Sequence, residues 1–314
     1  MQGETREKLF LPLYLGVDAS EPEPVRGKLI GSLEEVEGVL EFGDQAVLIL
    51  GGGEMASATA HRLNRCGFKV CITEIAKPLA VRRGVSFCTA VYTGQIVVEG
   101  VRGQLISDIR EVSSLWARGE IPVLVDSQAE IRKQMNPRVI VDARMAKRNL
   151  GTRASDAPFV VGLGPGLRLD VDVHCVIETN RGHNLGRIWT DREADPDTGI
   201  PGTIGGYSTE RVLKSPVNGV YVAEREIGDI VWKGERVARV GDEDIRVQID
   251  GVLRGLLYSG LTVTKGLKVG DIDPRGDPTY CYTISDKART ISGSVLEAIL
   301  NWLRGQNHSG RGQS

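Results

Sequence analysis

Short apolar, β-branched runs alternate with amphipathic stretches from residue 45 onward, and this pattern predicts an α/β fold. Five runs are expected to be strands, at residues 46–50, 69–74, 95–98, 121–126 and 139–142. Helical periodicity follows the first run and recurs near residues 107–118 and 127–135. Because such alternation is typical of strands joined by crossover helices, a parallel sheet flanked by helices is expected.

Past residue 153 the pattern changes to glycine-punctuated, β-branched segments, which predict a mostly β region. Within it a shift of 32 residues aligns a repeat without a gap, pairing Gly219 with Gly251, Gly228 with Gly260, Lys233 with Lys265 and Gly234 with Gly266. Each copy is too small to bury a core by itself. The two copies are therefore expected to pair as a pseudo-twofold, barrel-like sandwich.

The repeat resembles biotinyl and lipoyl carrier domains, which place a modified lysine in the hairpin that joins their halves. Here the hairpin reads Gly241-Asp242-Glu243-Asp244-Ile245-Arg246. It contains no lysine, so no lipoyl or biotinyl group is expected. The module is interpreted as a docking or clamping unit.

Four segments follow from these patterns. They are an N-terminal arm (1–43), a Rossmann-like nucleotide-binding domain (44–153), a β-rich domain (154–303) with the repeat at 215–241 and 247–273 and a terminal helix, and a disordered tail (304–314). The expected fold class is an α/β Rossmann-like domain with a parallel sheet, followed by a mostly β region that contains a pseudo-twofold barrel-sandwich module and a C-terminal helix.

The turn after the first strand carries the clearest candidate for ligand binding. Glycine at Gly51, Gly52 and Gly53 permits a tight turn and close approach of a phosphate, and the small Ala56 lets the helix pack on the strand. The helix N-terminus then offers free N–H groups to a pyrophosphate. Glu74 follows about 20 residues later, where a carboxylate binds a ribose diol and repels a 2′-phosphate, which favours NAD-like ligands. The alternative is an ordinary βαβ turn that binds nothing.

Polar clusters in the second half supply candidate catalytic residues, although no catalytic role is assigned. Asn180, Arg181 and His183 lie in the densest polar loop, where arginine can hold an acidic group and histidine can exchange protons near neutral pH. The alternative is a solvated hairpin loop. Asp273, Asp286 and Lys287 belong to charged segments ahead of the last helix and could line an anionic ligand site, or merely surround a helix cap.

Composition excludes several classes of protein. The net charge of −2, without basic runs, gives no attraction to nucleic acid. No run approaches the roughly 18 apolar residues of a membrane span, so a cytoplasmic protein is expected. The five cysteines lack CxxC spacing, and the histidines lack metal-ligand spacing, so neither a disulfide framework nor a metal site is expected. Motifs typical of serine hydrolases, P-loop NTPases and zincins are absent from the sequence.

Several long motifs resemble the YqeB family. They are Gly51-Gly52-Gly53-Glu54-Met55-Ala56 and residues 73–78, 82–87, 178–187, 270–275 and 284–289. Members of that family are accessory proteins of selenium-dependent molybdenum hydroxylases, and their N-terminal half is similar to the Rossmann part of XdhC/CoxI-type maturation proteins. The chain departs from the family's usual GGGD or GAGD at Glu54, and its first 43 residues lie outside the family's usual start.

The resemblance implies an accessory or maturation protein that binds NAD or a molybdopterin dinucleotide-type cofactor. Its expected partners are a molybdenum hydroxylase client or other maturation factors, with a homo-oligomer also open. Two alternatives remain: an NAD-dependent oxidoreductase that acts on a small metabolite, and a non-catalytic scaffold.

Overall fold

The computed structural model describes residues 45–310, with side chains described through residue 306. The described residues form one compact unit. The N-terminal arm expected over residues 1–43 lies outside the described part of the chain.

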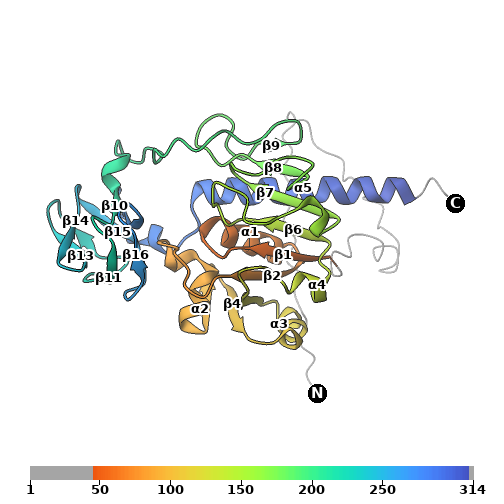
Figure 1. Cartoon of the computed structure of the whole chain (residues 1–314), viewed down its shortest axis with the longest axis horizontal. Helices are drawn as coiled ribbons and strands as arrows, with labels where there is room; N and C mark the ends of the chain where they lie inside the picture. Colours follow the sequence, from red (N-terminus) through yellow and green to blue (C-terminus); the bar gives the residue numbers. More distant parts are fainter. Residues whose placement is uncertain (1–44, 311–314) are drawn as a thin grey trace, which may run out of the picture. The chain divides into compact units, whose positions relative to one another are not determined.

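Nine strands form one mixed sheet in the order β3-β4-β5-β2-β1-β6-β7-β8-β9 (Figure 1). The seven strands from β4 to β8 in this order pair in parallel. The outer strands β3 and β9 pair antiparallel. The strands are β1 (Ala46–Leu50), β2 (Lys69–Glu74), β3 (Gln95–Val98), β4 (Val101–Ile106), β5 (Ile121–Val125), β6 (Val139–Asp142), β7 (Phe159–Leu163), β8 (Cys175–Ile177) and β9 (Ile188–Trp189).

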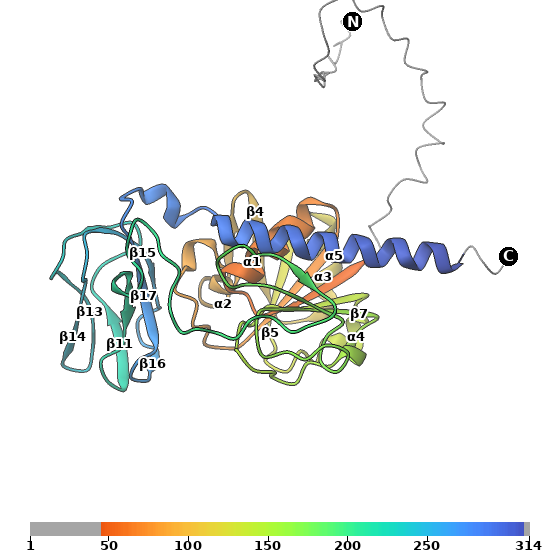
Figure 2. The same ribbon diagram turned by 90° about the horizontal axis from the view of Figure 1, so that it is seen from above.

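Two helices pack side by side on this sheet, as Figures 1 and 2 show. α1 (Glu54–Arg65) buries mainly small residues, three of them alanines, and small side chains allow close approach of α5 (Asp286–Gly310). α5 buries Ile291, Val295 and Ile299 in the same core. The remaining α-helices are α2 (Ala90–Thr93), α3 (Val112–Ala117) and α4 (Arg132–Met135), and the 3₁₀ turns are Arg83–Val85, Phe87–Thr89, Ile109–Glu111, Ala154–Asp156, Thr209–Arg211 and Pro278–Cys281.

The remaining strands form two four-stranded sheets, β10-β17-β15-β12 and β14-β13-β11-β16. Their shared core includes Tyr221, Val237, Leu253 and Val269. The strands are β10 (Val212–Lys214), β11 (Gly219–Ala223), β12 (Ile230–Val231), β13 (Arg236–Val240), β14 (Glu243–Arg246), β15 (Gly251–Leu256), β16 (Thr262–Val263) and β17 (Lys268–Asp273).

The 32-residue repeat reappears in the pairing of these strands. Gly219 of β11 pairs with Val263 of β16, and the equivalent Gly251 of β15 pairs with Val231 of β12. Each copy therefore pairs two of its strands with the other copy. This exchange explains why neither copy would be stable alone, since strands of two residues bury little surface without a partner.

The expected fold class is wrong. The main sheet is mixed rather than parallel, and it does not end at residue 153, because β7 and β8 continue it from β6. Strands β10 to β17 form two four-stranded sheets over a shared core rather than the one barrel-like module that was expected. The physical reason is that a buried central strand and a sandwich strand both read as a short β-branched run, so sequence pattern alone cannot assign either to its sheet.

The last helix also differs from the expected organisation. α5 packs on α1 of the main sheet rather than on the two small sheets. It continues through Gly310, where a disordered tail from residue 304 was expected.

Candidate functional site

The glycine turn between β1 and α1 is packed against the protein at two of its three glycines. Gly51 has a φ of +90°, and a Cβ there would lie 3.1 Å from Arg144 Cα. A Cβ on Gly52 would lie 2.9 Å from both the amide nitrogen and the Cβ of Cys88. Only Gly53 faces open space, with nothing within 4 Å of an added Cβ. Packing thus accounts for Gly51 and Gly52, while Gly53 leaves room for a ligand.

The side chain of Glu74, at the end of β2, forms a hydrogen bond with this same turn. One carboxylate oxygen accepts a hydrogen bond from Gly52 N–H at 2.8 Å, and the other accepts from Ile75 N–H at 2.7 Å. Burial raises the pKa of Glu74, and these backbone hydrogen bonds oppose that rise. The Gly52 N–H group is therefore already bonded to a side chain of the protein. Only the remaining lone pairs of the Glu74 carboxylate could accept hydrogen bonds from a ribose. Ala56 is fully buried.

A cavity of about 790 Å³ opens beside the N-terminus of α1. Its walls come from segments that follow β1, β7 and β8, from the small sheets and from the start of α5. Those parallel strands all end at the same edge of the sheet, which is where α/β proteins bind ligands. The volume falls within the range of roughly 300–1,000 Å³ that is usual for small-molecule sites. We call this cavity the cationic cleft.

Cations outnumber carboxylates along its walls. Among the described residues the acidic lining consists of Glu54, Asp195, Asp197 and Asp271. The basic lining consists of Arg82, Lys147, Arg181, Arg211, Lys214, Arg254, Lys268 and Lys287. Eight cations against four carboxylates create a positive potential that favours an anionic ligand.

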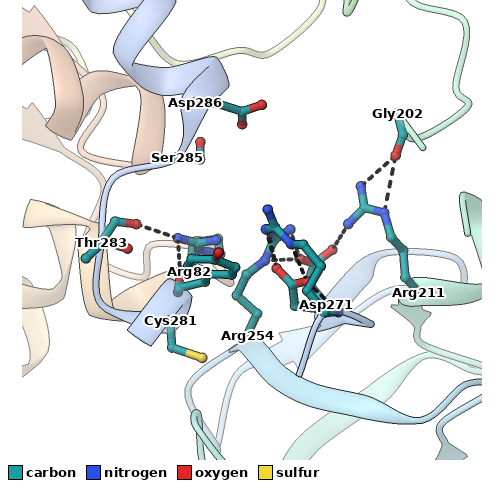
Figure 3. Close-up of polar contacts among 12 residues, drawn as sticks. Arg82, Gly202, Arg211, Arg254, Asp271, Cys281, Thr283, Ser285 and Asp286 are labelled. Atoms are coloured by element: carbon teal, nitrogen blue, oxygen red, sulfur yellow. Dashed lines mark hydrogen bonds and ion pairs between the residues drawn. The ribbon is translucent and has the colours of Figure 1, made fainter. Parts of the chain in front are cut away.

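Asp271 organises the deepest of these cations. It is fully buried and accepts hydrogen bonds from Arg211 Nη1 at 2.7 Å and from Arg254 Nε at 2.8 Å (Figure 3). Lys268 Nζ lies 3.3 Å away. Burial acts to raise the pKa of Asp271, but the three cations lower it below 3.8. The carboxylate stays ionised and fixes both guanidinium groups at the wall of the cleft.

Asp273 forms a second anchor behind Arg254. It is also fully buried, and it accepts from Arg254 Nη1 at 3.1 Å and from Arg275 Nη2 at 2.7 Å. Burial opposes ionisation, but the hydrogen bonds from Arg275 and the charge of Arg254 leave the pKa of Asp273 below 3.8. Asp273 therefore positions Arg254 rather than facing the cleft itself.

Among the buried arginines of the cleft, Arg82 is the one whose charge and hydrogen-bond donors are least satisfied by the protein. Its side chain is 6% exposed, and its Nη2 donates to the carbonyl oxygens of Tyr280 and Thr283, each at 3.0 Å. Its Nε finds no hydrogen-bond partner among the described residues. The nearest carboxylate, on Glu54, is 3.7 Å away. Burial lowers the pKa of Arg82, but a guanidinium remains charged at neutral pH.

Residues at the N-termini of two helices also line the cleft. α1 begins at Glu54 after Gly53, which provides no side-chain cap, and Glu54 and Met55 line the cavity. α5 begins at Asp286, and the preceding Ser285 lines the cavity while its Oγ accepts from Ala288 N–H at 3.3 Å. Helix N-termini carry partial positive charge. Both therefore add to the field of the arginines.

The structure brings three of the six candidate catalytic residues to this cleft. Arg181 and Asn180 line it, as does Lys287. Arg181 forms two hydrogen bonds of 3.0 Å with Asp286, so the polar loop after β8 is tied to the start of α5. His183 is exposed and does not line the cleft.

Sequence reasoning missed the buried arginines. Arg82, Arg211 and Arg254 are 5%, 6% and 8% exposed. One signal was available, because Arg254 interrupts the apolar run of β15, and a charge inside such a run is rarely buried without a purpose. Arg82 and Arg211 lie outside any apolar run and gave no such signal.

Within residues 45–310 no group of three or more His, Cys, Asp or Glu side chains could hold a metal ion. No helix in this range is long and apolar enough to cross a membrane.

Solved structures give only distant similarity. An aspartoacylase family protein from Mesorhizobium loti is 13% identical, with 73% of this chain and 84% of that one covered and a TM-score of 0.24. The product-bound ectoine utilization protein EutE (DoeB) from Ruegeria pomeroyi is 12% identical over 73% and 84%, with a TM-score of 0.22. A succinylglutamate desuccinylase/aspartoacylase from Rhodobacter sphaeroides is 14% identical over 73% and 84%, with a TM-score of 0.23. Scores this low carry no argument about the fold or the site.

No protein-family model matches the chain. The chain is, however, 40% identical over 303 residues to the uncharacterized protein YqeB of Escherichia coli (strain K12). The match covers 93% of this chain and 56% of that relative, so the chain spans little more than half the relative's length. Identity at this level over nearly all of the chain agrees with the resemblance to the YqeB family that the glycine turn and the polar motifs around the cleft had indicated.

Proposed function

We propose that the cationic cleft binds a ligand with a phosphate or pyrophosphate group. The observation that carries the proposal is Arg82, whose buried Nε lacks a hydrogen-bond partner beside a surplus of fixed cations. A buried donor without a partner costs about 1–3 kcal/mol. An anion placed between Arg82 and Arg254 would remove that cost and balance the charge.

The ligand class follows from the shape of the donor set. Guanidinium groups bind phosphate oxygens in pairs, and helix N-termini add backbone N–H groups. NAD and a molybdopterin dinucleotide share a pyrophosphate, and the residues present fit that common part. The free space at Gly53 supports the approach of one phosphate to α1.

The family resemblance extends this binding activity to an accessory role. We propose that the chain serves the maturation of a selenium-dependent molybdenum hydroxylase by binding a phosphate-bearing cofactor and docking on the client or on another maturation factor. Hydride transfer is less well supported, because His183 does not line the cleft. The accessory role accounts for a binding site rich in fixed cations without an assigned base.

Calorimetry with ADP, NAD and pyrophosphate tests the binding proposal. Arg82→Gln should weaken binding by about 10- to 100-fold, since a hydrogen bond to a charged group is worth about 1.5–3 kcal/mol. Arg246→Gln is the matched control, because Arg246 is 56% exposed on the β13–β14 hairpin and outside the cleft. Its affinity should be unchanged, and affinity in the wild type should fall with added salt.

A second pair of variants tests the glycine turn without disturbing the fold. Gly53 has an extended backbone with φ −69° and no atom within 4 Å of an added Cβ, so both alanine and aspartate fit. Aspartate at this position caps α1 and should preserve stability. Gly53→Asp should nevertheless abolish phosphate binding by charge repulsion, while Gly53→Ala should reduce it only slightly. Equal affinity in both variants, or no binding of any phosphate compound by the wild type, would refute the proposal.

A further inference from the structure

Lys287 occupies a position that the local rules of helix formation disfavour. It lies in the first turn of α5, where the helix dipole repels a cation. Its side chain is half-buried in the wall of the cationic cleft. Its ammonium group has no hydrogen bond or ion pair among the described residues, unlike those of Lys147 and Lys268, which pair with Asp197 and Asp271. Such local conflicts in natural proteins concentrate at functional sites.

The surroundings of Lys287 lower the pKa of its amine. Burial lowers its pKa below 10.5, and Arg181, from the loop after β8, and Lys268, on β17, lower it further. Glu54 on α1 and Glu178 next to β8 oppose this effect but do not reverse it. Glu178 is itself engaged, because it accepts from Asn180 N–H at 2.7 Å and from Asp195 N–H at 2.8 Å. Desolvation and a nearby cation are the two conditions that turn lysine into a nucleophile.

From this placement we propose that Lys287 forms a reversible imine with an aldehyde or ketone that also carries a phosphate or carboxylate group. The anionic group would lie on the guanidinium groups of Arg82 and Arg254, which line the same cleft. The carbonyl carbon would then face the Lys287 amine. This inference rests on the proposed anion site and adds a covalent step to it.

The step balances without any further reagent. The lone pair of the neutral Lys287 nitrogen attacks the carbonyl carbon, and the C=O π bond opens to give a carbinolamine. The two protons of the amine leave with the carbonyl oxygen as water, and a C=N bond remains. Hydrolysis reverses the sequence, so the ligand is held but not consumed.

Reductive trapping provides the test. The 314-residue chain is incubated with pyridoxal 5′-phosphate, an anionic aldehyde, or with pyridoxal, its form without phosphate, and is then treated with borohydride. Borohydride delivers hydride to the imine carbon and fixes the adduct, which peptide mass spectrometry assigns to one lysine. Lys287→Arg keeps the charge and is the main variant, and Lys233→Arg, at an exposed turn outside the cleft, is its control.

We expect Lys287 to be labelled first and faster than exposed lysines, since a lowered pKa raises the neutral fraction of the amine near neutral pH. Labelling should rise with pH and level off below the range of ordinary lysine. It should fall to background in Lys287→Arg and stay unchanged in Lys233→Arg. Circular dichroism confirms that each variant is folded.

The two compounds separate failure of this inference from failure of the anion site. Preferential labelling of Lys287 by pyridoxal 5′-phosphate supports both. Preferential labelling by both compounds at equal rates supports the reactive amine and contradicts the phosphate-binding cleft. Labelling spread evenly over exposed lysines, while ADP or pyrophosphate still binds, overturns the imine proposal and leaves the cleft intact.

Discussion

Asp271→Asn should destabilise the protein more than any other single loss of charge around the cleft. The side chain is fully buried and accepts from two arginines, at 2.7 and 2.8 Å. Asparagine keeps one acceptor but points an N–H₂ group at a guanidinium and leaves Arg211 and Arg254 without their shared counter-charge. Breaking one partner of a buried pair costs about 3–5 kcal/mol.

This loss of stability can be converted into a change in melting temperature. For domains of 150–250 residues about 1 kcal/mol shifts Tm by about 2–4 °C, so Asp271→Asn should melt roughly 6–20 °C below the wild type. Asp244→Asn is the matched control, because Asp244 also pairs with two arginines, Arg236 and Arg246, but on an exposed hairpin. Exposed pairs contribute about 0–1 kcal/mol, so this variant should melt within a few degrees of the wild type.

The pH dependence has a definite sign. The folded pKa of Asp271 lies below its ordinary value of 3.8, so its ionised form stabilises the native state. That stabilisation is fully present above pH 3.8 and is lost as the pH falls through the folded pKa. Asp271→Asn lacks this group, so its free energy of unfolding should decline less steeply below pH 3.8.

Anions provide a second readout in the same assay. Removing the carboxylate raises the positive charge of the cluster by one, so phosphate should raise the Tm of Asp271→Asn more than that of the wild type. Calorimetry or fluorimetry over a phosphate series measures both effects. The reasoning would be refuted if Asp271→Asn had the same Tm as Asp244→Asn and if phosphate raised its Tm no more than that of the wild type.

Three further outcomes are expected. Gly52→Ala should lower stability by about 1–3 kcal/mol in chemical denaturation, because its Cβ would lie 2.9 Å from backbone and side-chain atoms of Cys88. Arg181→Gln should raise the pKa of Asp286 from about 2 toward 3.8, which carboxylate NMR measures, because Arg181 is the main cause of the depression. A thiol reagent should modify about one cysteine per native chain, the exposed Cys66, since the other four are buried.

The sequence pattern predicted local structure well where a strand coincides with a single uninterrupted apolar run. The strands at residues 46–50, 69–74, 95–98 and 139–142 have the bounds expected for them. The pattern missed β4, where Gly103 and Gln104 interrupt the apolar run, and it assigned β7 and β8 to a separate domain. Pairing partners depend on contacts between distant segments, and no local period records those contacts.

The site was predictable only in part, and for a related reason. The polar loop with Arg181 and the charged segment with Asp286 were singled out separately, and the structure joins them by two hydrogen bonds. The buried arginines escaped notice because a guanidinium in the sequence looks the same whether it is solvated or buried against a carboxylate. Only the fold places Arg211 and Arg254 on one aspartate.

Contacts that connect the small sheets to the main sheet lie beside the cations of the cleft. Arg82 precedes the turn at Arg83–Val85, and it donates to the carbonyls of Tyr280 and Thr283. The neighbouring Arg83 donates from Nε to the Leu256 carbonyl of β15 at 2.6 Å. In the described chain the linked cations Arg82, Arg211, Arg254, Lys268 and Arg275 meet three carboxylates, those of Glu54, Asp271 and Asp273, which leaves two positive charges uncompensated.

This surplus links ligand binding to stability. A ligand at 100 times its Kd stabilises the native state by about 2.7 kcal/mol, a sizeable part of the stability of an ordinary domain. Because the surplus lies where the small sheets meet the main sheet, an anion should strengthen that contact selectively. Hydrogen exchange should therefore slow at β15 and at the start of α5 when pyrophosphate binds, and it should stay unchanged at the β13–β14 hairpin, which lies outside the cleft.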